Sequence, residues 1–338
     1  MSVGLDIGSK TIKMVELSPD GKGMKLQAAG VLGYKGADIE KLEDEKDFVA
    51  VAEVVRKLHK EAKISSKEVV LSLPEHLVFT QTIKFPPLTD AEIASAVKWE
   101  AEQIIPIPVA EAIIQHQILE RREKASPPVV IVLLVAAPRS LVEKYAKIVH
   151  LGRLTPVAVE TDLVALVRAL APPDKTVLIV DFGAKSTDLA IAKNGLLSFS
   201  RSIPTAGEAF TRAVAQALDV EPAQAEEYKK TYGLSEEKLE GKVKSSLSSV
   251  FKVVTDEIKK AIHYYQTEEQ GDAPKSLILS GGTSGMPDAL SELTNLLEME
   301  VEIGNPFKNI TVDPGMEKSL AGYAPLYSVA VGLALRGK

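Results

Sequence analysis

The stretch LDIGSKTIK at residues 5–13 recurs as VDFGAKSTD at residues 180–188, and these two stretches decide the fold. Both read apolar-Asp-apolar-Gly-small-Lys-hydroxyl, and the second begins about half of the 338 residues after the first. Each predicts a strand that turns tightly at its glycine and returns as a second strand. Two copies of such a unit at this spacing predict two similar lobes that face each other.

The elements that flank the two copies follow the same order. Three strand-like runs and a helix accompany the first copy, at residues 3–8, 11–17, 25–34 and 48–62. The second copy opens the same series, at residues 177–181, 187–192, 196–203 and 207–218. A strand at 69–73 closes the first series, and a long helix at 243–266 with a strand at 276–280 closes the second. The sequence therefore predicts an α/β protein.

A segment with a different pattern of predicted elements separates the two series, at residues 80–153. We expect a leading strand followed by a helix, two strands and a helix, hence an inserted subdomain. Its first helix is predicted to begin after Thr89, because Thr89 and Glu92 form a capping box. Trp99, the only tryptophan, falls outside the apolar stripe of this helix, and we favour packing against a neighbouring element over a recognition surface.

The composition excludes several classes of protein. Hydrophobic residues make up 45% and charged residues 25%, as in ordinary globular domains. A formal net charge of −6 argues against nucleic acid as a partner. The absence of cysteine excludes disulfides and thiolate sites. The longest apolar run, residues 129–137, is too short for a membrane-spanning helix of about 20 residues, so we expect a cytosolic protein.

The two repeated turns carry the residue types that bind phosphate. Glycine lets the backbone approach a ligand closely, and neighbouring hydroxyls add donors toward phosphate oxygens. Ionised aspartates only accept hydrogen bonds, so Asp6 and Asp181 suit a hydrated Mg²⁺, which we expect them to hold through water. The phosphate candidates are Gly8, Ser9 and Thr11 in the first turn and Gly183, Ser186 and Thr187 in the second.

A third glycine-rich turn follows the strand at 276–280. It contains Gly281, Gly282, Thr283 and Ser284 and precedes a predicted helix from about residue 287. Either a hydroxyl of this turn is the N-cap of that helix, or the backbone here approaches a nucleotide. Because two other turns of phosphate-binding type are present, we favour the nucleotide.

In this combination the chain resembles the actin-like ATPase superfamily, whose members fold as two RNase H-like lobes that close on ATP and Mg²⁺. Residues 5–13 and 180–188 resemble its two phosphate motifs, and residues 279–285 resemble its adenosine motif. The resemblance implies ATP and Mg²⁺ as cofactors. It also adds three nucleotide-binding candidates, which are Gly207 and the pair Glu226 and Lys229 that resembles the ribose and adenine contacts of the family.

Four further residues take candidate roles from this resemblance. Lys13 lies where actin has a phosphate-contacting lysine, and Lys10 and Lys185 at the turn tips are either phosphate ligands or solvated lysines. Glu160 falls where chaperone-type members keep a glutamate that orients the attacking water, and the alternative is an acid favoured at a helix N-terminus. Because binding residues can persist where hydrolysis is slow or absent, the sequence leaves enzymatic activity undecided.

The insert narrows the resemblance to two branches, the FtsA and PilM families, which carry an α/β module called 1C at this place. The sequences WEAEQIIPIP at 99–108, IKMVEL at 12–17 and AEEYKKTYGL at 225–234 are more similar to the PilM family. This resemblance implies a first RNase H-like lobe of residues 1–79, 154–174 and 320–338, a 1C subdomain of residues 80–153, and a second RNase H-like lobe of residues 175–319.

Resemblance to the PilM family implies a cytoplasmic ATP-binding scaffold of type IV pilus assembly. Such a scaffold binds the cytoplasmic N-terminal tail of the membrane protein PilN in a groove between the first lobe and 1C, and other pilus assembly proteins are further partners. The chain stops at Lys338 without the membrane helix of FtsA-like proteins, so we expect it at the inner face of the cytoplasmic membrane through its partner, without direct insertion. Two alternatives stay open, an FtsA-like filament-forming division protein and an actin-fold ATPase or kinase, and homo-oligomerisation leaves no readable pattern.

Overall fold

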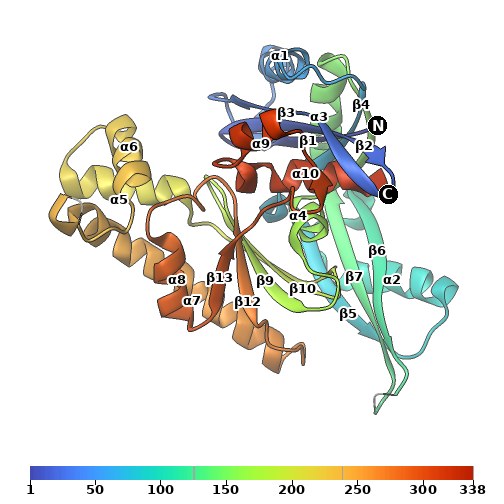
Figure 1. Cartoon of the computed structure of the whole chain (residues 1–338). Coiled ribbons are helices and arrows are strands. Elements are labelled where there is room, and N and C mark those ends of the chain that lie inside the picture. Colours follow the sequence, from blue (N-terminus) through green and yellow to red (C-terminus); the bar gives the residue numbers. More distant parts are fainter. Residues whose placement is uncertain (125, 238, 338) are drawn as a thin grey trace.

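Strands from both repeated halves and from the insert form three sheets in the computed structural model, which describes residues 1–124, 126–237 and 239–337 (Figure 1). The elements predicted around the two repeated stretches are confirmed. Figure 1 shows the first sheet in the upper part of the molecule, the second sheet below it, and the strands of the insert at the lower right.

The first sheet contains the N-terminal copy of the repeat, in the strand order β14-β3-β2-β1-β4-β8. Its β1 pairs antiparallel with β2 and parallel with β4. The strands are β1 (Ser2–Ile7), β2 (Thr11–Asp20), β3 (Gly23–Gly33), β4 (Glu68–Leu73), β8 (Thr155–Thr161) and β14 (Ile310–Thr311).

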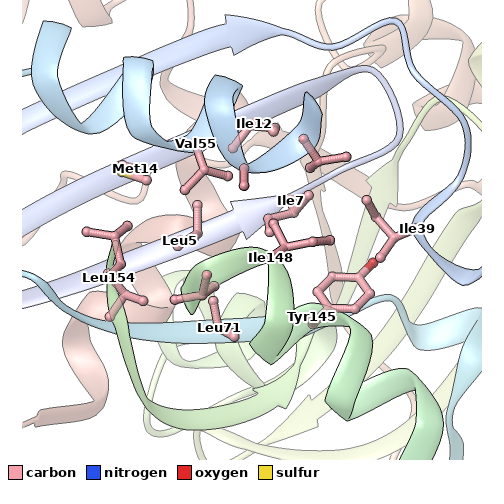
Figure 2. Close-up of a cluster of buried hydrophobic side chains, with 14 of the residues drawn as sticks. Leu5, Ile7, Ile12, Met14, Ile39, Val55, Leu71, Tyr145, Ile148 and Leu154 are labelled. Atoms are coloured by element: carbon pink, nitrogen blue, oxygen red, sulfur yellow. The ribbon is translucent and has the colours of Figure 1, made fainter. Parts of the chain in front are cut away.

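Helices cover both faces of this sheet, which explains why β1 is buried at nearly every position. On one face, Leu5, Val55 and Tyr145 share a core (Figure 2). On the other face, Gly4 lets the last helix approach closely, because a Cβ there would lie 2.0 Å from the carbonyl oxygen of Ala330. The helices are α1 (Glu45–Glu61) and α3 (Arg139–Leu151) on the first face, and α4 (Asp162–Leu170) and α10 (Ser328–Ala334) on the second.

The second sheet repeats the arrangement of the first around the other copy. Its β9 pairs antiparallel with β10 and parallel with β12, as β1 does with β2 and β4. The strand order is β11-β10-β9-β12-β13, with β9 (Thr176–Phe182), β10 (Thr187–Lys193), β11 (Leu196–Ile203), β12 (Ser276–Ser280) and β13 (Glu300–Ile303). The helices that share its core are α5 (Gly207–Leu218), α6 (Pro222–Tyr232), α7 (Lys242–Thr267) and α8 (Ala289–Leu297).

The insert has a sheet of its own, in the order β5-β7-β6. The predicted capping box of its helix is present, since the Thr89 hydroxyl accepts from the Glu92 amide at 3.4 Å and the Glu92 carboxylate accepts from the Thr89 amide at 2.8 Å. The expected packing of Trp99 is wrong, because this side chain is 65% exposed. The elements are β5 (Phe79–Phe85), α2 (Asp90–Ile104), β6 (Ala112–Arg122) and β7 (Val129–Pro138).

Two segments that the expected boundaries assign to the insert and to the second lobe pack against the first sheet. Helix α3, placed at the end of the insert by its sequence, contributes Tyr145 and Ile148 to the core of the first sheet. After β13 the chain returns to the first sheet earlier than residue 320, since Phe307 and Ile310 share a core with Val15 of β2. The boundaries inferred from the resemblance therefore stay a proposal, and the packing moves both segments toward the first lobe.

One hydrophobic cluster joins all three sheets. It contains Val70 of β4, Leu133 of β7 and Ile179 of β9, packed around Leu163 of α4. A hydrogen bond also links the insert to the second sheet, from the Thr82 hydroxyl to the carbonyl of Ser198 at 2.8 Å. The insert is thus anchored to both halves of the molecule.

Within the described part of the chain, none of the helices has the length and apolar character that crossing a membrane requires.

Candidate nucleotide site

The two repeated hairpins close their turns in the same way. In the first, the Gly8 amide donates to the Thr11 carbonyl at 3.1 Å, and in the second, the Gly183 amide donates to the Ser186 carbonyl at 3.1 Å. A Cβ at Gly183 would lie 2.8 Å from that same carbonyl oxygen, which is too close for any side chain. The glycine that the sequence assigned to phosphate binding is also required by the turn itself.

The residues that face each other across the hairpins differ in charge. Asp6 pairs with Lys13, whose ammonium group donates to the carboxylate at 2.9 Å with both side chains 10% exposed. In the second hairpin Asp181 pairs with Asp188 instead. Burial, and then the charge of Asp188, raises the pKa of Asp181 to about 7, while Lys13 lowers this pKa and Asp6 raises it. The ends of the two hairpins therefore lie within electrostatic reach of each other.

The lysines at the two turn tips both form ion pairs across the lobes. Lys10 in the first turn pairs with Glu208 of α5 at 2.7 Å. Lys185 in the second turn pairs with Asp38, which follows the first sheet's β3. The structure thus brings the two predicted phosphate motifs together and gives each turn lysine an acidic partner in the opposite half.

The hydroxyl groups of the two turns differ in availability. Thr187 is fully buried and donates to the Thr205 carbonyl at 2.7 Å, and Ser186 donates to Asp188 at 2.8 Å. Ser9 and Thr11 in the first turn are partly exposed. Hydroxyl donors toward a ligand are therefore more accessible in the first turn than in the second.

The third glycine turn packs directly against the second hairpin. Gly281 has φ +87°, and a Cβ there would lie 2.5 Å from the carbonyl oxygen of Phe182. The Thr283 amide donates to that Phe182 carbonyl at 3.1 Å, and the Thr283 hydroxyl donates to the Gly183 carbonyl at 3.3 Å. The Gly207 amide reaches the same Gly183 carbonyl at 3.2 Å. Three predicted nucleotide contacts thus meet around one carbonyl group.

The rest of this turn is open or internally bonded. The Ser284 hydroxyl donates to the Gly281 carbonyl at 2.7 Å, and a Cβ at Gly282 would meet only Leu326, at 3.5 Å. The alternative that Thr283 or Ser284 caps the following helix is wrong, because α8 begins at Ala289.

Glu226 and Lys229 lie on one face of α6, as their spacing predicts. The Lys229 ammonium group donates to Glu226 at 2.7 Å, to the Gly207 carbonyl at 3.0 Å and to the Thr211 hydroxyl at 3.0 Å. Burial lowers the pKa of Lys229. This pair is hydrogen-bonded to Gly207 in the first turn of α5, and Gly207 and Thr283 both donate to the Gly183 carbonyl. The pair therefore lies close to the third glycine turn.

Glu160 does not have the free carboxylate that a water-positioning residue needs. The guanidinium group of Arg168 donates two hydrogen bonds to it, at 2.6 and 2.8 Å, and Arg336 lies at 3.7 Å. A carboxylate held this way is neutralised and fixed in orientation. Its predicted role in orienting water stays a prediction, and the geometry gives it a structural partner.

Three residues that sequence reasoning did not select surround the hairpin ends. Asp162, the first residue of α4, has its pKa raised well above the ordinary value by burial and by the charge of Asp6. Ser72 Oγ and Glu75 Oε2 are buried without a hydrogen-bond partner among the described residues. Burial raises the pKa of Glu75 to about 7. These residues could have been selected from the sequence as polar residues at or just after the end of an apolar strand. Asp6 and Asp181 were selected by the same feature.

The oxygen atoms at this place suit a hydrated Mg²⁺. Among residues 1–124, 126–237 and 239–337, no three acidic or histidine side chains converge closely enough to hold a metal ion by themselves. Mg²⁺ keeps several waters and takes one or two carboxylates together with phosphate oxygens. This requirement is met by the carboxylates of Asp6 and Asp181 and by the unpartnered hydroxyl of Ser72. Ser72 lies near Asp6, because the residues that precede them, Leu71 and Leu5, are paired in adjacent strands.

Comparisons with known proteins show the family of the chain. A family model described as "Type IV pilus assembly protein PilM" matches residues 4–338. The solved structure described as "PilM-PilN type IV pilus biogenesis complex" is similar, with a TM-score of 0.85 and 28% identity, over 99% of this chain and 98% of that chain.

Two further proteins are similar to the chain. The cell division protein FtsA of Pseudomonas aeruginosa is 30% identical over 182 residues, which span 48% of this chain and only 42% of FtsA. The structure of MreB5 of Spiroplasma citri bound to ADP has a TM-score of 0.53 and 13% identity, over 98% of this chain and 94% of MreB5. The latter likeness shows that the two chains share an architecture.

Proposed function

Because the chain belongs to the PilM family of type IV pilus assembly proteins, we propose that it is an ATP-binding scaffold of the pilus assembly complex. The observation that carries the proposal is the arrangement of the three glycine turns: the Gly281 turn packs on Gly183, and the ion pairs of Lys10 with Glu208 and of Lys185 with Asp38 hold the two hairpin turns toward each other. The family model covers residues 4–338, whereas FtsA matches 48% of the chain, which favours pilus assembly over cell division.

Each side of the proposed site has a separate task. The backbone amides and hydroxyls of the first turn bind phosphate, because they are the donors at the more open turn. The Lys13 ammonium group, paired with Asp6 and 3.2 Å from where a Cβ at Gly8 would lie, adds positive charge beside them. Gly207, Glu226 and Lys229 hold the ribose and base, next to the third glycine turn. MreB5, which shares this architecture, is described with bound ADP, and this supports nucleotide as the ligand class.

When bound, Mg²⁺ neutralises charge on the phosphate oxygens. Asp6 and Asp181 hold it through water in the proposed site. Since the pKa of Asp181 is about 7, this carboxyl is partly protonated at neutral pH, and a bound metal ion would favour its ionised form. Nucleotide with Mg²⁺ is therefore expected to bind more tightly at pH 8 than at pH 6.

We infer slow or absent hydrolysis from the state of Glu160. Its carboxylate is occupied by Arg168, so it does not accept the proton of an attacking water as a free general base would. Nucleotide then serves to set the position of the two lobes, and no catalytic turnover is required.

The proposed partner is the cytoplasmic N-terminal tail of PilN, at the junction of the first lobe and the insert. The PilM–PilN complex supports this, because its similar chain is aligned over 99% of the present one. Binding the tail of a membrane protein places the chain at the inner face of the membrane.

A titration with a fluorescent ATP analogue tests the nucleotide site. Asp6→Asn and Asp181→Asn should each weaken binding with Mg²⁺ by about tenfold or more, because each removes a charge that holds the metal. Asp174→Asn, an exposed aspartate in the loop before β9, is the matched control and should leave affinity unchanged. Equal affinity of all four proteins would show that the hairpins do not bind nucleotide.

Peptide binding tests the partner separately. A synthetic PilN N-terminal peptide should bind the intact chain and slow hydrogen exchange in β5 to β7 or in the first sheet, whether or not the hairpin aspartates are substituted. Protection confined to the second sheet, or no binding, would refute the partner assignment while leaving the nucleotide site standing.

A further inference from the structure

A cavity of about 330 Å³ lies away from the hairpins and is not used by the proposed nucleotide site. Its walls are the end of α4, the segment 305–310 and the residues Leu335 and Arg336 that follow α10. Helix α4 carries the chain from the first sheet to the second, and residues 304–309 carry it back. The cavity therefore lies where both connections between the lobes pass.

Cations dominate the lining of this cavity. Arg168, Lys308 and Arg336 line it, and Glu160 lies behind the two arginines, 10% exposed and bonded to Arg168. Among the described residues, Glu160 and the three cations of the lining together carry an excess of two positive charges. Lys308 is exposed and stands apart from the Glu160 cluster, so its charge is available to a ligand.

The uncharged part of the lining divides into donors and an apolar wall. Asn305 accepts the Phe307 amide through Oδ1 at 3.0 Å, which leaves its NH₂ group as a donor, and Asn309 adds a second amide. Ile310 and Leu335 provide apolar surface beside them. Such a set can bind an anionic head and cover the carbon atoms attached to it.

We propose that this cavity binds a phosphate monoester, carried by a small organic molecule or by a lipid headgroup. A phosphate monoester has a charge of about −1.5 to −2 at pH 7, which matches the excess charge of the lining, whereas a single carboxylate would leave part of it uncompensated. Several acceptor oxygens also suit donors that approach from α4, from the 305–310 segment and from the C-terminal residues. Since these elements include both connections between the lobes, the bound phosphate restrains their relative motion.

Calorimetric titration and hydrogen exchange test the proposal on the full chain, at constant ionic strength. Inorganic phosphate and glycerol 3-phosphate are the soluble probes, and phosphatidylcholine vesicles with and without phosphatidic acid are the membrane probes. One saturable site is expected with one of these two sources, with slowed exchange at residues 305–310. Binding to the soluble probes identifies a small molecule as the source, and binding to the acidic vesicles alone identifies a lipid.

Variants at two exposed lysines locate the binding. Lys308→Ala should weaken it about tenfold, as loss of one charge-assisted contact predicts, and Lys308→Arg should retain it. Lys318→Ala, an equal charge change on α9 (Pro314–Leu320), should have no effect. The proposal is overturned if neither source binds in a manner that depends on Lys308, or if phosphate protects only the hairpin residues 8–11 and 183–187.

Discussion

Glu75 offers a direct test of the electrostatics between the lobes. It is 4% exposed in the short helix (Glu75–Leu77) that follows β4, and its Oε2 has no hydrogen-bond partner among the described residues. Burial is the largest cause of its raised pKa of about 7, and the charge of Asp188 adds to it, while the Ser200 hydroxyl acts in the opposite sense. We predict that Glu75→Gln stabilises the ligand-free protein at pH 8.

The magnitude follows from the two pKa values. The ordinary pKa of 4.5 applies to the unfolded chain and about 7 to the folded one, so the folded state prefers the protonated acid. Stability from this group is complete below pH 4.5 and is lost as the pH rises to about 7. The loss amounts to about 3 kcal/mol at pH 8 and less than about 1 kcal/mol at pH 5. Gln, which does not ionise, avoids this loss.

Urea unfolding at pH 5, 6, 7 and 8, followed by circular dichroism, measures the effect. Fluorescence of the only tryptophan is a poor probe because Trp99 is already 65% exposed. The stability gained by Glu75→Gln should increase from pH 5 to pH 7 and then level off. Glu68→Gln, an exposed glutamate at the start of β4, is the control and should show no such increase.

A gain that stays constant between pH 5 and pH 8, or that appears equally in Glu68→Gln, would refute the assignment of a buried titrating acid at the lobe junction. A loss of stability at every pH would show that the acid is hydrogen-bonded in a way that Gln cannot reproduce.

Two further substitutions test the packing and the charges of the connecting helices. Gly332→Ala should lower the free energy of unfolding by about 3 kcal/mol or more, because its Cβ would lie 1.9 Å from the carbonyl oxygen of Ala165. Gly315→Ala is the control and should leave stability unchanged, because the space around Gly315 is open. Equal unfolding midpoints of the two variants would contradict the close helix contact. Arg168→Met should lower the free energy of unfolding by about 3 kcal/mol, because Glu160 stays buried with the more distant Arg336, at 3.7 Å, as its cation. Glu160→Gln in the same chain should recover most of that loss in a double-mutant cycle.

Local sequence patterns predicted the hairpins and the capping box because the information for them lies within a few residues. Asp6 and Lys13 are paired on two adjacent strands that the turn at Gly8 joins, so their arrangement follows from the turn alone. Thr89 and Glu92 are likewise three residues apart. The repeat of this hairpin at half the chain length then predicted the two-lobed α/β architecture.

The incorrect or incomplete expectations concern contacts between distant elements. Trp99 lies off the apolar stripe, but whether another element covers that position depends on the tertiary arrangement. The two-residue strand β14 has no local pattern of its own and forms only because the chain passes β3. Glu160 was selected by its position in the resemblance, and only the folded helix α4 shows that Arg168 turns back onto Glu160.

The hydrophobic cluster that includes Val70, Leu133 and Ile179 connects the two halves of the molecule and the insert. The insert shares apolar contacts with both halves. A rotation of one half relative to the other must therefore move the insert as well, or expose the side chains of this cluster to water. In the proposed complex, a partner bound to the insert would therefore be coupled to the occupancy of the nucleotide site, and the coupling would act equally in both directions.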